Sequence, residues 1–431
     1  MLKPGSELGL TLPPSTVHRS VKMPVDLLSL FSEDRFRCLD FHDASALDDR
    51  QVQDVVSAME AIHMGLLARI KHQHIVMPQN ELFRRDLRNW IDEKLSCVYV
   101  NDKKRAYLVE TTAMFMEYFY QNASHEFKMC IGAITASVIV IDDSMEDPVI
   151  KEQTRLYAYR YLRNLPQPEG ICTVYAEAMR NMDKVFGLRD PQVANMLVTT
   201  CLNFAESTYL ETKYIDAPPL QVKTTSDKHV DWCASKFPYW MRNMTGMPSL
   251  YGPAAFSISE ERSVPLDCWI AGADELNVFV NLSNDIFSFV KEIKARETTN
   301  YIQLLTRAKH QAGRRSQFKS PGGIWTCRDS LYEVCCRFAD SVQALDELYI
   351  SFAENVPQAS SEGTDAAVGV TQEQLEKARL TAKVWKEFRQ GYVASSIELT
   401  RYGLDNLRAM CRAAVDKPIE MPTPKPSNDH L

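Results

Sequence analysis

The sequence predicts an all-α protein, because helical periodicity recurs along the chain while the signals of strands and hairpins are missing. Gln51–Arg69 places apolar residues at 55, 56, 59, 62 and 66, the spacing of one helix face. Only 16 of the 431 residues are glycine, and no alternating segment is bounded by an Asn-Gly or Asp-Gly turn. Further helices are expected at 81–98, 106–120, 126–143, 172–186, 191–213, 227–245, 266–295, 329–354 and 375–415.

The helical pattern predicts one domain with an irregular segment at each end. Residues 1–24 are rich in Pro, Ser and Gly and are expected to be irregular, and the Pro-rich tail at 416–431 is expected to be disordered. We expect residues 25–415 to form a single all-α domain in which 25–80 is a helical N-terminal extension. Two internal segments predict flexible surface loops, the basic, Gly- and Pro-containing 312–324 and the small, polar 355–370.

Composition excludes several classes of protein. The net charge of −7 and the absence of a basic stripe argue against nucleic acid as a partner. The longest apolar run, Ile131–Ile141, is far short of the roughly 20 residues that span a bilayer, and the N-terminus has no apolar signal segment. The 11 cysteines lack CxxC spacing and predict reduced thiols. We therefore expect a cytoplasmic protein, which would need metal ions or a few focused cations to bind an acidic ligand.

An apolar helix runs into four carboxylates within six residues, Asp142, Asp143, Glu146 and Asp147. Pro148 is expected to end this helix near Asp147, so the carboxylates would stand where the helix dipole is already negative. A divalent cation would compensate them, and Asp142 and Glu146, four residues apart, would share one face. Oxygen ligands favour Mg²⁺, with Mn²⁺ as a substitute, over zinc. Taken alone, the pattern also suits an ordinary solvated acidic helix end.

A second polar group lies in a segment otherwise rich in Val, Phe and Ile. Asn284, Ser288 and Glu292 are spaced four residues apart and would form one stripe about 12 Å long on a helix. An amide oxygen, a hydroxyl and a carboxylate in line are a suitable ligand set for one hard cation, and Lys291 could reach a phosphate. Alone, the stripe could be a buried polar seam between helices. Together with the acidic cluster, it predicts the facing wall of one cavity.

The two motifs together resemble those of the class I terpene synthases. Asp-Asp-x-x-Glu at 142–146 and Asn-Asp-x-x-Ser-x-x-Lys-Glu at 284–292 are similar to the fungal trichodiene-synthase-like sesquiterpene cyclases, and the resemblance covers roughly residues 80–410. It implies a helical bundle around a central active-site cavity that holds three Mg²⁺ ions and a prenyl diphosphate. The metal ligands that it implies are Asp142, Glu146, Asn284, Ser288 and Glu292.

The resemblance also implies cationic groups that bind diphosphate. Arg242, in the segment Tyr239–Gly246, is similar to the family's pyrophosphate-sensor arginine, with Thr245 and Gly246 in the positions of its linker and effector residues. Gly246 and Pro248 predict a helix break there without any family argument. Lys291 and Arg242 are thus expected at the diphosphate.

Arg401 and Tyr402 resemble the family's terminal Arg-Tyr pair. Arginine suits a bidentate grip on phosphate, and in trichodiene-like relatives this arginine can also pair with the second aspartate of the acidic motif, which would be Asp143 here. Thr400 and Gly403 flank the pair where the family tends to be more basic. The catalytic residues implied in this way are Asp142, Asp143, Arg242, Arg401 and Tyr402.

The activity implied by the resemblance is Mg²⁺-dependent ionisation and cyclisation of a linear isoprenyl diphosphate, most simply farnesyl diphosphate, to a cyclic sesquiterpene with release of diphosphate. The alternatives are a chain-elongating prenyl diphosphate synthase, an all-α metal-dependent phosphohydrolase and a noncatalytic helical scaffold. A homodimer is a family-level expectation. Candidates for the wall of a hydrocarbon pocket are Thr135, Val138, Ile139, Phe204, Tyr209, Trp240, Phe279 and Tyr392.

Overall fold

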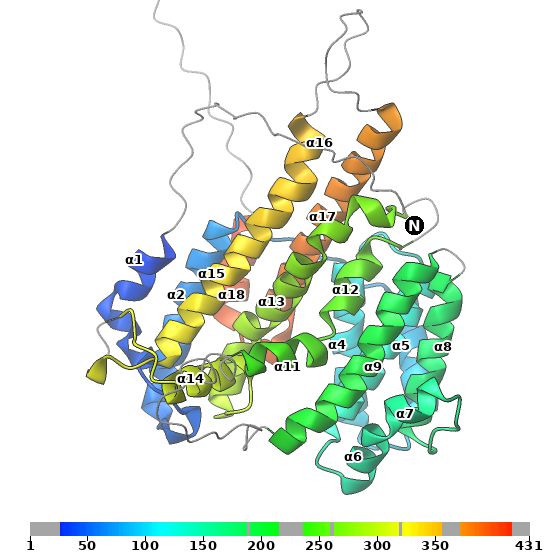
Figure 1. The fold of residues 1–431 in the computed structure, drawn as a ribbon, viewed down its shortest axis with the longest axis horizontal. Helices are drawn as coiled ribbons and strands as arrows, with labels where there is room; N and C mark the ends of the chain where they lie inside the picture. Colours follow the sequence, from blue (N-terminus) through cyan, green and yellow to red (C-terminus); the bar gives the residue numbers. More distant parts are fainter. Residues whose placement is uncertain are drawn as a thin grey trace, which may run out of the picture.

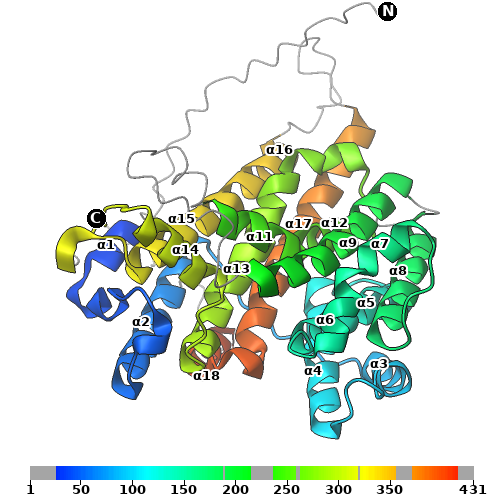
Figure 2. The ribbon, with the colours of Figure 1, turned by 60° about the horizontal axis from the view of Figure 1, so that its bottom comes forward.

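The chain folds as an all-helical bundle, in agreement with the predicted fold class (Figures 1 and 2). The computed structural model describes residues 26–187, 190–214, 236–258, 263–318, 321–355 and 371–415. Within these ranges no strand forms, and only two isolated β-bridges are present. The irregular start (1–24), the tail (416–431), all but the first residue of the loop expected at 355–370, and residues 227–235 of the helix expected at 227–245 lie outside the described residues. Among the helices that are described, none has the length and apolarity needed to cross a bilayer.

Most of the predicted helices are confirmed to within a few residues. Capping side chains mark where several of them begin: Asp48 and Gln51 form a reciprocal capping box at the first long helix, and Thr371 and Gln374 form another at the last. The α-helices are α1 (Leu27–Ser32), α2 (Asp49–Arg69), α3 (Glu81–Lys94), α4 (Asp102–Phe119), α5 (His125–Asp143), α6 (Pro148–Arg155), α7 (Tyr157–Leu162), α8 (Ile171–Gly187), α9 (Pro191–Tyr214), α11 (Phe237–Thr245), α12 (Pro248–Ala255), α13 (Ala273–Lys294), α14 (Tyr301–Gln311), α15 (Cys327–Leu345), α16 (Phe352–Asn355), α17 (Gln372–Glu398) and α18 (Asp405–Val415).

Two of the predicted helices are wrong in extent. The helix expected at 266–295 begins only at Ala273, after two short 3₁₀ turns. The helix expected at 375–415 stops at Glu398 and is followed by a 3₁₀ turn, Thr400–Tyr402, before α18 begins. Gly403, with φ of 66°, ends that turn in the left-handed region, which glycine adopts without steric cost. The break places Arg401 and Tyr402 on a turn instead of on a helix face.

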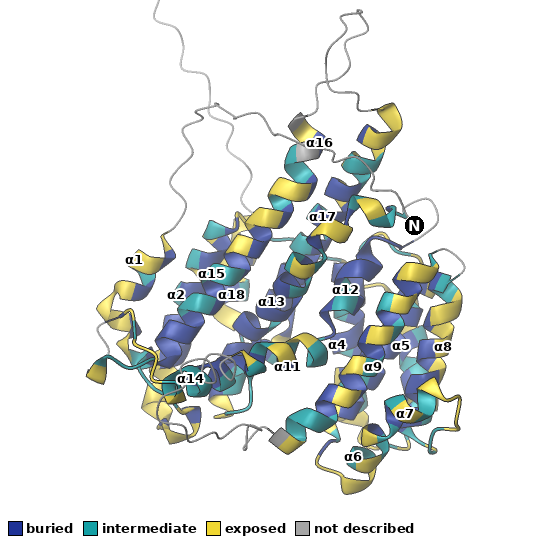
Figure 3. Ribbon diagram, in the orientation of Figure 1, coloured by how far each residue is buried: buried dark blue, intermediate teal, exposed yellow. Residues whose placement is uncertain are grey.

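Helix α13 is the central element of the bundle (Figure 3). It packs against α2, α12, α15 and α17, and most of its residues are buried. The ring of Phe279 lies 5.6 Å from that of Phe338 and 5.1 Å from that of Trp385, which fixes the rotation of α13 relative to α15 and α17. These contacts orient the polar stripe that follows further along the same helix.

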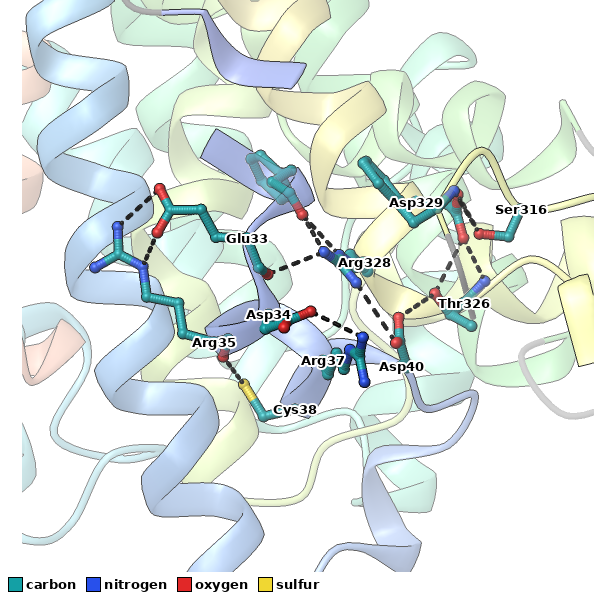
Figure 4. Close-up of polar contacts among 12 residues, drawn as sticks. Glu33, Asp34, Arg35, Arg37, Cys38, Asp40, Ser316, Thr326, Arg328 and Asp329 are labelled. Carbon is teal, nitrogen blue, oxygen red and sulfur yellow. Dashed lines mark hydrogen bonds and ion pairs between the residues drawn. The ribbon is translucent and has the colours of Figure 1, made fainter. Parts of the chain in front are cut away.

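The N-terminal extension is fastened to α15 by a buried arginine (Figure 4). The guanidinium of Arg328 donates hydrogen bonds to the carbonyl oxygens of Phe31 (2.8 Å) and Glu33 (3.1 Å) and forms an ion pair with Asp40 at 3.6 Å. The side chains of Arg328 and Asp40 are only 3% and 6% exposed. A buried pair of this kind requires each partner to remain charged and satisfied.

A second attachment joins the extension to α13. His63 of α2 is fully buried, one of its ring nitrogens lies 3.0 Å from the carbonyl oxygen of Ile286, and its ring stacks on Phe287. Burial lowers the pKa of His63 from 6.5 to about 4, so the ring is neutral at pH 7. The extension therefore packs as part of the domain core.

The segment at 312–324, predicted to be a mobile surface loop, folds back on itself in the part that is described. The backbone N–H of Ser316 donates to the carbonyl of Gly323 (3.1 Å), and that of Trp325 donates to Arg314 (3.0 Å). The hydroxyl of Ser316 donates to Asp329 on α15 at 2.9 Å. These hydrogen bonds hold the described residues of the loop against α15.

We predict that Arg328→Met lowers the free energy of unfolding by about 3 kcal/mol, because it leaves the buried Asp40 without its partner. Urea denaturation monitored by circular dichroism measures the effect. Arg37→Met is the matched control, since Arg37 forms an exposed ion pair with Asp34, and it should change stability by less than about 1 kcal/mol. Equal effects of the two substitutions would contradict a stabilising role for the buried ion pair of Arg328 and Asp40.

We predict that His63 makes the protein less stable in mild acid. Its pKa is lower in the folded chain (about 4) than the ordinary value of 6.5, so the unfolded chain takes up the proton first as the pH falls. The stabilisation is complete above pH 6.5 and is lost as the pH falls from 6.5 towards 4. When the pH falls from 7.5 to 5.5, the free energy of unfolding of the wild type should decrease by about 1 kcal/mol more than that of His63→Gln. Identical pH dependence in the two proteins would show that His63 is not buried as described.

Candidate active site

A cavity of about 470 Å³ lies between α4, α5, α9, α11, α13, α17 and the turn Thr400–Tyr402. Three of its carboxylates lie near the C-terminal ends of helices, with Asp142 in the last turn of α5, Glu211 in that of α9 and Glu292 near the end of α13. Other polar lining residues come from the middle of α13, from α11, from 297–300 and from the turn Thr400–Tyr402. Among its apolar lining residues, Val138 and Ile139 lie earlier on α5 and Phe204 earlier on α9, whereas Phe115 and Phe119 come from α4 and Tyr392 from α17. The cavity brings together eight of the predicted site residues: Asp142, Arg242, Asn284, Ser288, Lys291, Glu292, Arg401 and Tyr402.

The predicted arrangement of the acidic cluster is wrong after Asp143. Helix α5 ends at Asp143, and Asp147 instead begins α6, where its carboxylate accepts hydrogen bonds from the backbone N–H groups of Val149 (2.8 Å) and Ile150 (3.4 Å). Pro148 occupies the first turn of α6, a position that suits proline. Glu146 therefore does not share a helix face with Asp142. It is exposed and does not line the cavity, whereas Asp142 does.

Asp143 is held by a tyrosine instead of by the predicted arginine. The hydroxyl of Tyr99 donates to Oδ2 of Asp143 at 2.5 Å. Arg401 is close enough for its charge to interact with Asp143, but no ion pair forms between these two residues. Burial, followed by the hydrogen bond to Asp143, raises the pKa of Tyr99, so its hydroxyl remains a donor. Tyr99 was not recognised in the sequence, where nothing in its surroundings marks it.

The polar stripe of α13 faces the cavity as predicted. The hydroxyl of Ser288 donates to Oε1 of Glu292 at 2.5 Å. The amide nitrogen of Asn284 donates to the hydroxyl of Tyr402 (2.8 Å), and its amide oxygen accepts a hydrogen bond from Nη2 of Arg242 (2.8 Å). All three stripe residues are thus oriented by hydrogen bonds, and the oxygen of Asn284 already contacts a cation.

Arg242 is anchored at the cavity by the residue that follows Asn284. Its Nε donates to Oδ1 of Asp285 at 2.7 Å, and Asp285 is almost fully buried. Desolvation raises the pKa of Asp285 to about 6, although the arginine opposes this shift. Lys291 and Arg401 also line the cavity, and neither forms an ion pair with another residue in the described part of the chain. Two cations are therefore available to an anionic ligand.

Negative charge exceeds positive charge in the lining. Five carboxylates and only three cations face the cavity. Desolvation, followed by the charge of Asp142, raises the pKa of Glu211 to about 7, and desolvation raises that of Glu292 to about 7 as well. Asp142 is reached by solvent through the cavity mouth, yet the protein around it also raises its pKa. The lining carboxylates are Asp142, Glu211, Asp285, Glu292 and Glu297.

The donor set fits Mg²⁺ shared with a phosphate-bearing ligand. Within the described ranges, no three carboxylate, histidine or cysteine side chains converge to hold a metal by themselves. The cavity instead offers Asp142 on one wall and an amide oxygen, a hydroxyl and a carboxylate on α13. Mg²⁺ is commonly bound by one or two carboxylates while phosphates and water complete its coordination. Oxygen-only ligands also argue against zinc.

Gly246 is required by a close approach at the break between α11 and α12. A Cβ at this position would lie 2.0 Å from Oδ1 of Asn281 and 2.8 Å from Nη1 of Arg242. The next residue, Met247, has φ of 49°, so the backbone turns there before Pro248 begins α12. The break predicted from Gly246 and Pro248 is confirmed. It places the end of α11, and with it Arg242, directly against α13.

The apolar part of the cavity contains some of the predicted residues and several that were missed. Val138, Ile139, Phe204 and Tyr392 line it as predicted. Phe279 instead belongs to the core, Trp240 is 50% exposed, and Thr135 and Tyr209 are not among the lining residues. The rings of Phe119 and Tyr392 stack at 4.4 Å. The aromatic lining residues missed in the sequence are Phe115, Phe119, Tyr251 and Tyr301.

A helical bundle with a cavity between the C-terminal ends of its helices is the fold of the class I terpene synthases. The structure aligns with α-eudesmol synthase over 76% of this chain and 98% of that chain, with a TM-score of 0.50 and 14% identity. It aligns with the linalool/nerolidol synthase of Streptomyces clavuligerus over 74% and 96% of the two chains, with a TM-score of 0.50 and 12% identity. These likenesses show the fold.

Sequence comparison finds the same family of proteins. The chain is 28% identical over 193 residues to terpene synthase BipA of Cochliobolus sativus, covering 44% of this chain and 53% of that protein. It is 25% identical over 177 residues to longiborneol synthase of Gibberella zeae, covering 41% and 48%. The match thus spans about half the length of these curated relatives, and no protein-family model matches the chain. Together with the fold, these matches confirm the resemblance to class I terpene synthases.

We predict that Gly246→Ala destabilises the protein because the new methyl group overlaps Asn281. Removing the obstructing amide should relieve the most severe overlap and leave the milder contact with Arg242, so Gly246→Ala combined with Asn281→Ala should melt at a higher temperature than Gly246→Ala alone. Differential scanning fluorimetry measures both. Gly252→Ala is the control, since its Cβ would meet Leu276 at an ordinary 3.5 Å and should be tolerated. A double variant no more stable than the single one would contradict the contact.

Proposed function

We propose that the protein is a Mg²⁺-dependent class I terpene cyclase that ionises and cyclises a linear isoprenyl diphosphate, with farnesyl diphosphate as the favoured substrate, and releases diphosphate. One observation carries the proposal. A single cavity joins a charged mouth, with excess carboxylate and two unpaired cations, to an interior of aromatic and aliphatic side chains. Such a cavity suits a molecule with an anionic head and a hydrocarbon tail.

The charged mouth supports binding of the diphosphate. Lys291 and Arg401 would contact its oxygens, and Arg242 would add a third cation after leaving the amide of Asn284. Asp142 together with Asn284, Ser288 and Glu292 would hold Mg²⁺, which when bound supplies Lewis-acid stabilisation of the leaving diphosphate. Since the unliganded lining is already net negative, diphosphate binding without divalent cations is disfavoured.

The chemical step follows from these charges. The C–O bond of the substrate breaks heterolytically, both electrons remain with the diphosphate, and an allylic cation is left in the apolar part. The π electrons of a distant double bond in the same chain then form the ring bond, and loss of one proton to the released diphosphate gives the neutral hydrocarbon. Preorganised cations at the mouth stabilise the charge that develops on the leaving group. The rings of Phe115, Phe119 and Tyr392 can stabilise the cation, each by about 0.5–2 kcal/mol in a desolvated cavity. The apolar lining also excludes the water that would otherwise capture the cation.

Two alternatives, a chain-elongating synthase and a noncatalytic scaffold, can be distinguished from a cyclase by analysis of the reaction products. A chain-elongating prenyl diphosphate synthase would need a second, homoallylic diphosphate, and α13 offers a single set of ligand oxygens where that class usually has a second aspartate-rich motif. A noncatalytic scaffold would retain the fold without turnover. Homodimer formation and a cytoplasmic location remain predictions from the sequence.

The deciding experiment incubates the purified protein with farnesyl diphosphate and Mg²⁺ and analyses the products by gas chromatography–mass spectrometry. The expected result is a cyclic hydrocarbon that disappears when EDTA is added, whereas a linear alcohol would indicate the phosphohydrolase alternative. Parallel reactions with geranyl and geranylgeranyl diphosphate test the chain length, and a reaction with added isopentenyl diphosphate tests elongation. A longer prenyl diphosphate, or no product under any condition, would overturn the proposal.

We predict that Asp142→Ala, Asn284→Ala and Glu292→Gln each lower kcat/KM by at least about 100-fold, because each removes a proposed ligand oxygen or its charge. The structure supplies a matched control in Glu146→Ala, which removes a nearby carboxylate that does not line the cavity. It should keep activity within about threefold of the wild type, in line with a surface substitution. Steady-state kinetics with a diphosphate-release assay distinguishes the two groups. A large loss in Glu146→Ala would restore its predicted role as a metal ligand.

A further inference from the structure

A buried cluster of charged side chains lies beside the turn that carries Arg401 and Tyr402. Glu398 is the last residue of α17, and its side chain is only 2% exposed. Oε1 of Glu398 accepts a hydrogen bond from Nε2 of His74 at 2.8 Å, and both carboxylate oxygens contact the guanidinium of Arg412 on α18. We refer to His74, Glu398 and Arg412 as the Glu398 cluster.

The cluster ties together three segments that are distant in the sequence. His74 belongs to the connection between α2 and α3 and is itself 4% exposed, Glu398 ends α17, and Arg412 lies in α18. Arg408, also on α18, donates to the backbone carbonyl of Glu398 at 3.1 Å. Both the side chain and the backbone of Glu398 are therefore fixed at the point where the chain leaves α17.

The turn that follows packs against α13, and its flanking residues Leu399 and Leu404 are buried. The turn Thr400–Tyr402 is one 3₁₀ turn, held locally by backbone bonds from Tyr402 to Leu399 (3.2 Å) and from Gly403 to Thr400 (3.1 Å). Arg401 forms no ion pair within the described residues, and its position is set by the backbone that carries it. Tyr402 reaches α13 through the hydrogen bond from Asn284. The direction in which the chain leaves Glu398 therefore acts together with the packing on α13 to set where these two side chains enter the cavity.

We propose that Glu398 is a positioning residue for the diphosphate end of the cavity, acting through the turn that presents Arg401 and Tyr402. The inference rests on the proposed function, because it takes Arg401 to be a diphosphate contact. Glu398 itself does not line the cavity. Charge supports the assignment: burial opposes ionisation of Glu398, but hydrogen bonds from Arg412 and His74 outweigh it and hold its pKa below the ordinary value. The carboxylate is therefore ionised, and the hydrogen bonds that it accepts from His74 and Arg412 hold the end of α17 in place.

The test measures binding of inorganic diphosphate in the presence of Mg²⁺ by isothermal titration calorimetry, on folded full-length protein. Glu398→Gln should weaken binding roughly tenfold, a typical size for a residue that acts through its neighbours. His74→Gln keeps a side-chain N–H that can reach Glu398 and should weaken binding less. If Glu398→Gln does not fold, Arg412→Gln probes the same cluster from its more exposed member.

Two comparisons separate positioning from general stability. Arg328→Met removes the buried ion pair with Asp40, which lies outside the cavity lining. This substitution should lower stability without changing the affinity for diphosphate. In a background that carries Arg401→Ala and Tyr402→Phe, Glu398→Gln should cause no further loss, because the groups through which it acts are gone.

Each outcome decides a different claim. Wild-type protein that fails to bind diphosphate with Mg²⁺ would overturn the proposed function and this inference with it. Normal wild-type binding that is unchanged in Glu398→Gln, or a loss that persists in full in the Arg401→Ala/Tyr402→Phe background, would overturn the inference alone. Loss of affinity in Arg328→Met equal to that in Glu398→Gln would assign the effect to stability instead of position.

Discussion

The arrangement of the site depends on the repulsion among the carboxylates at the mouth of one cavity. Five acidic groups share a partly desolvated space with three cations, and the raised pKa values of Glu211 and Glu292 measure how costly their charges are there. A protein selected only for stability would have little reason to keep them. When a ligand binds together with divalent cations, the carboxylates would coordinate these cations, and the repulsion among them would be replaced by attraction to the metal.

The framework that tolerates this charge is apolar. Helix α13 carries its polar stripe on one side while the remaining sides are enclosed by α2, α12, α15 and α17. The aromatic cluster around Phe279 fixes the helix in rotation, and Gly246 allows α11 to approach it closely enough for Arg242 to reach Asn284. Dense packing thus holds the ligand oxygens in place before any ligand is present, which lowers the reorganisation needed at the moment of reaction.

The sequence predicted what depends on local spacing and failed where spatial neighbours decide. Residues four apart on an uninterrupted helix must share a face, so the α13 stripe could be predicted from its motif alone. Pro148 was predicted to end the preceding helix near Asp147, but proline also suits the first turn of a helix, and here it begins α6 after α5 has ended at Asp143. Glu146 therefore lies between the two helices and outside the cavity lining. Glu211 and Tyr99 carry no local pattern, and only the packing of α9 and of the segment after α3 brings them to the site.

The N-terminal extension, for which the sequence offered no role, packs into the core of the helical bundle. His63 inserts into the core beside α13, and Arg328 of α15 binds the backbone of Phe31 and Glu33. Because these contacts join residues 26–69 to the bundle, we expect the extension to unfold together with α13 and α15. A fragment beginning at Glu81 would expose apolar surface on α13 and α15, and it would be prone to aggregate instead of behaving as a smaller enzyme.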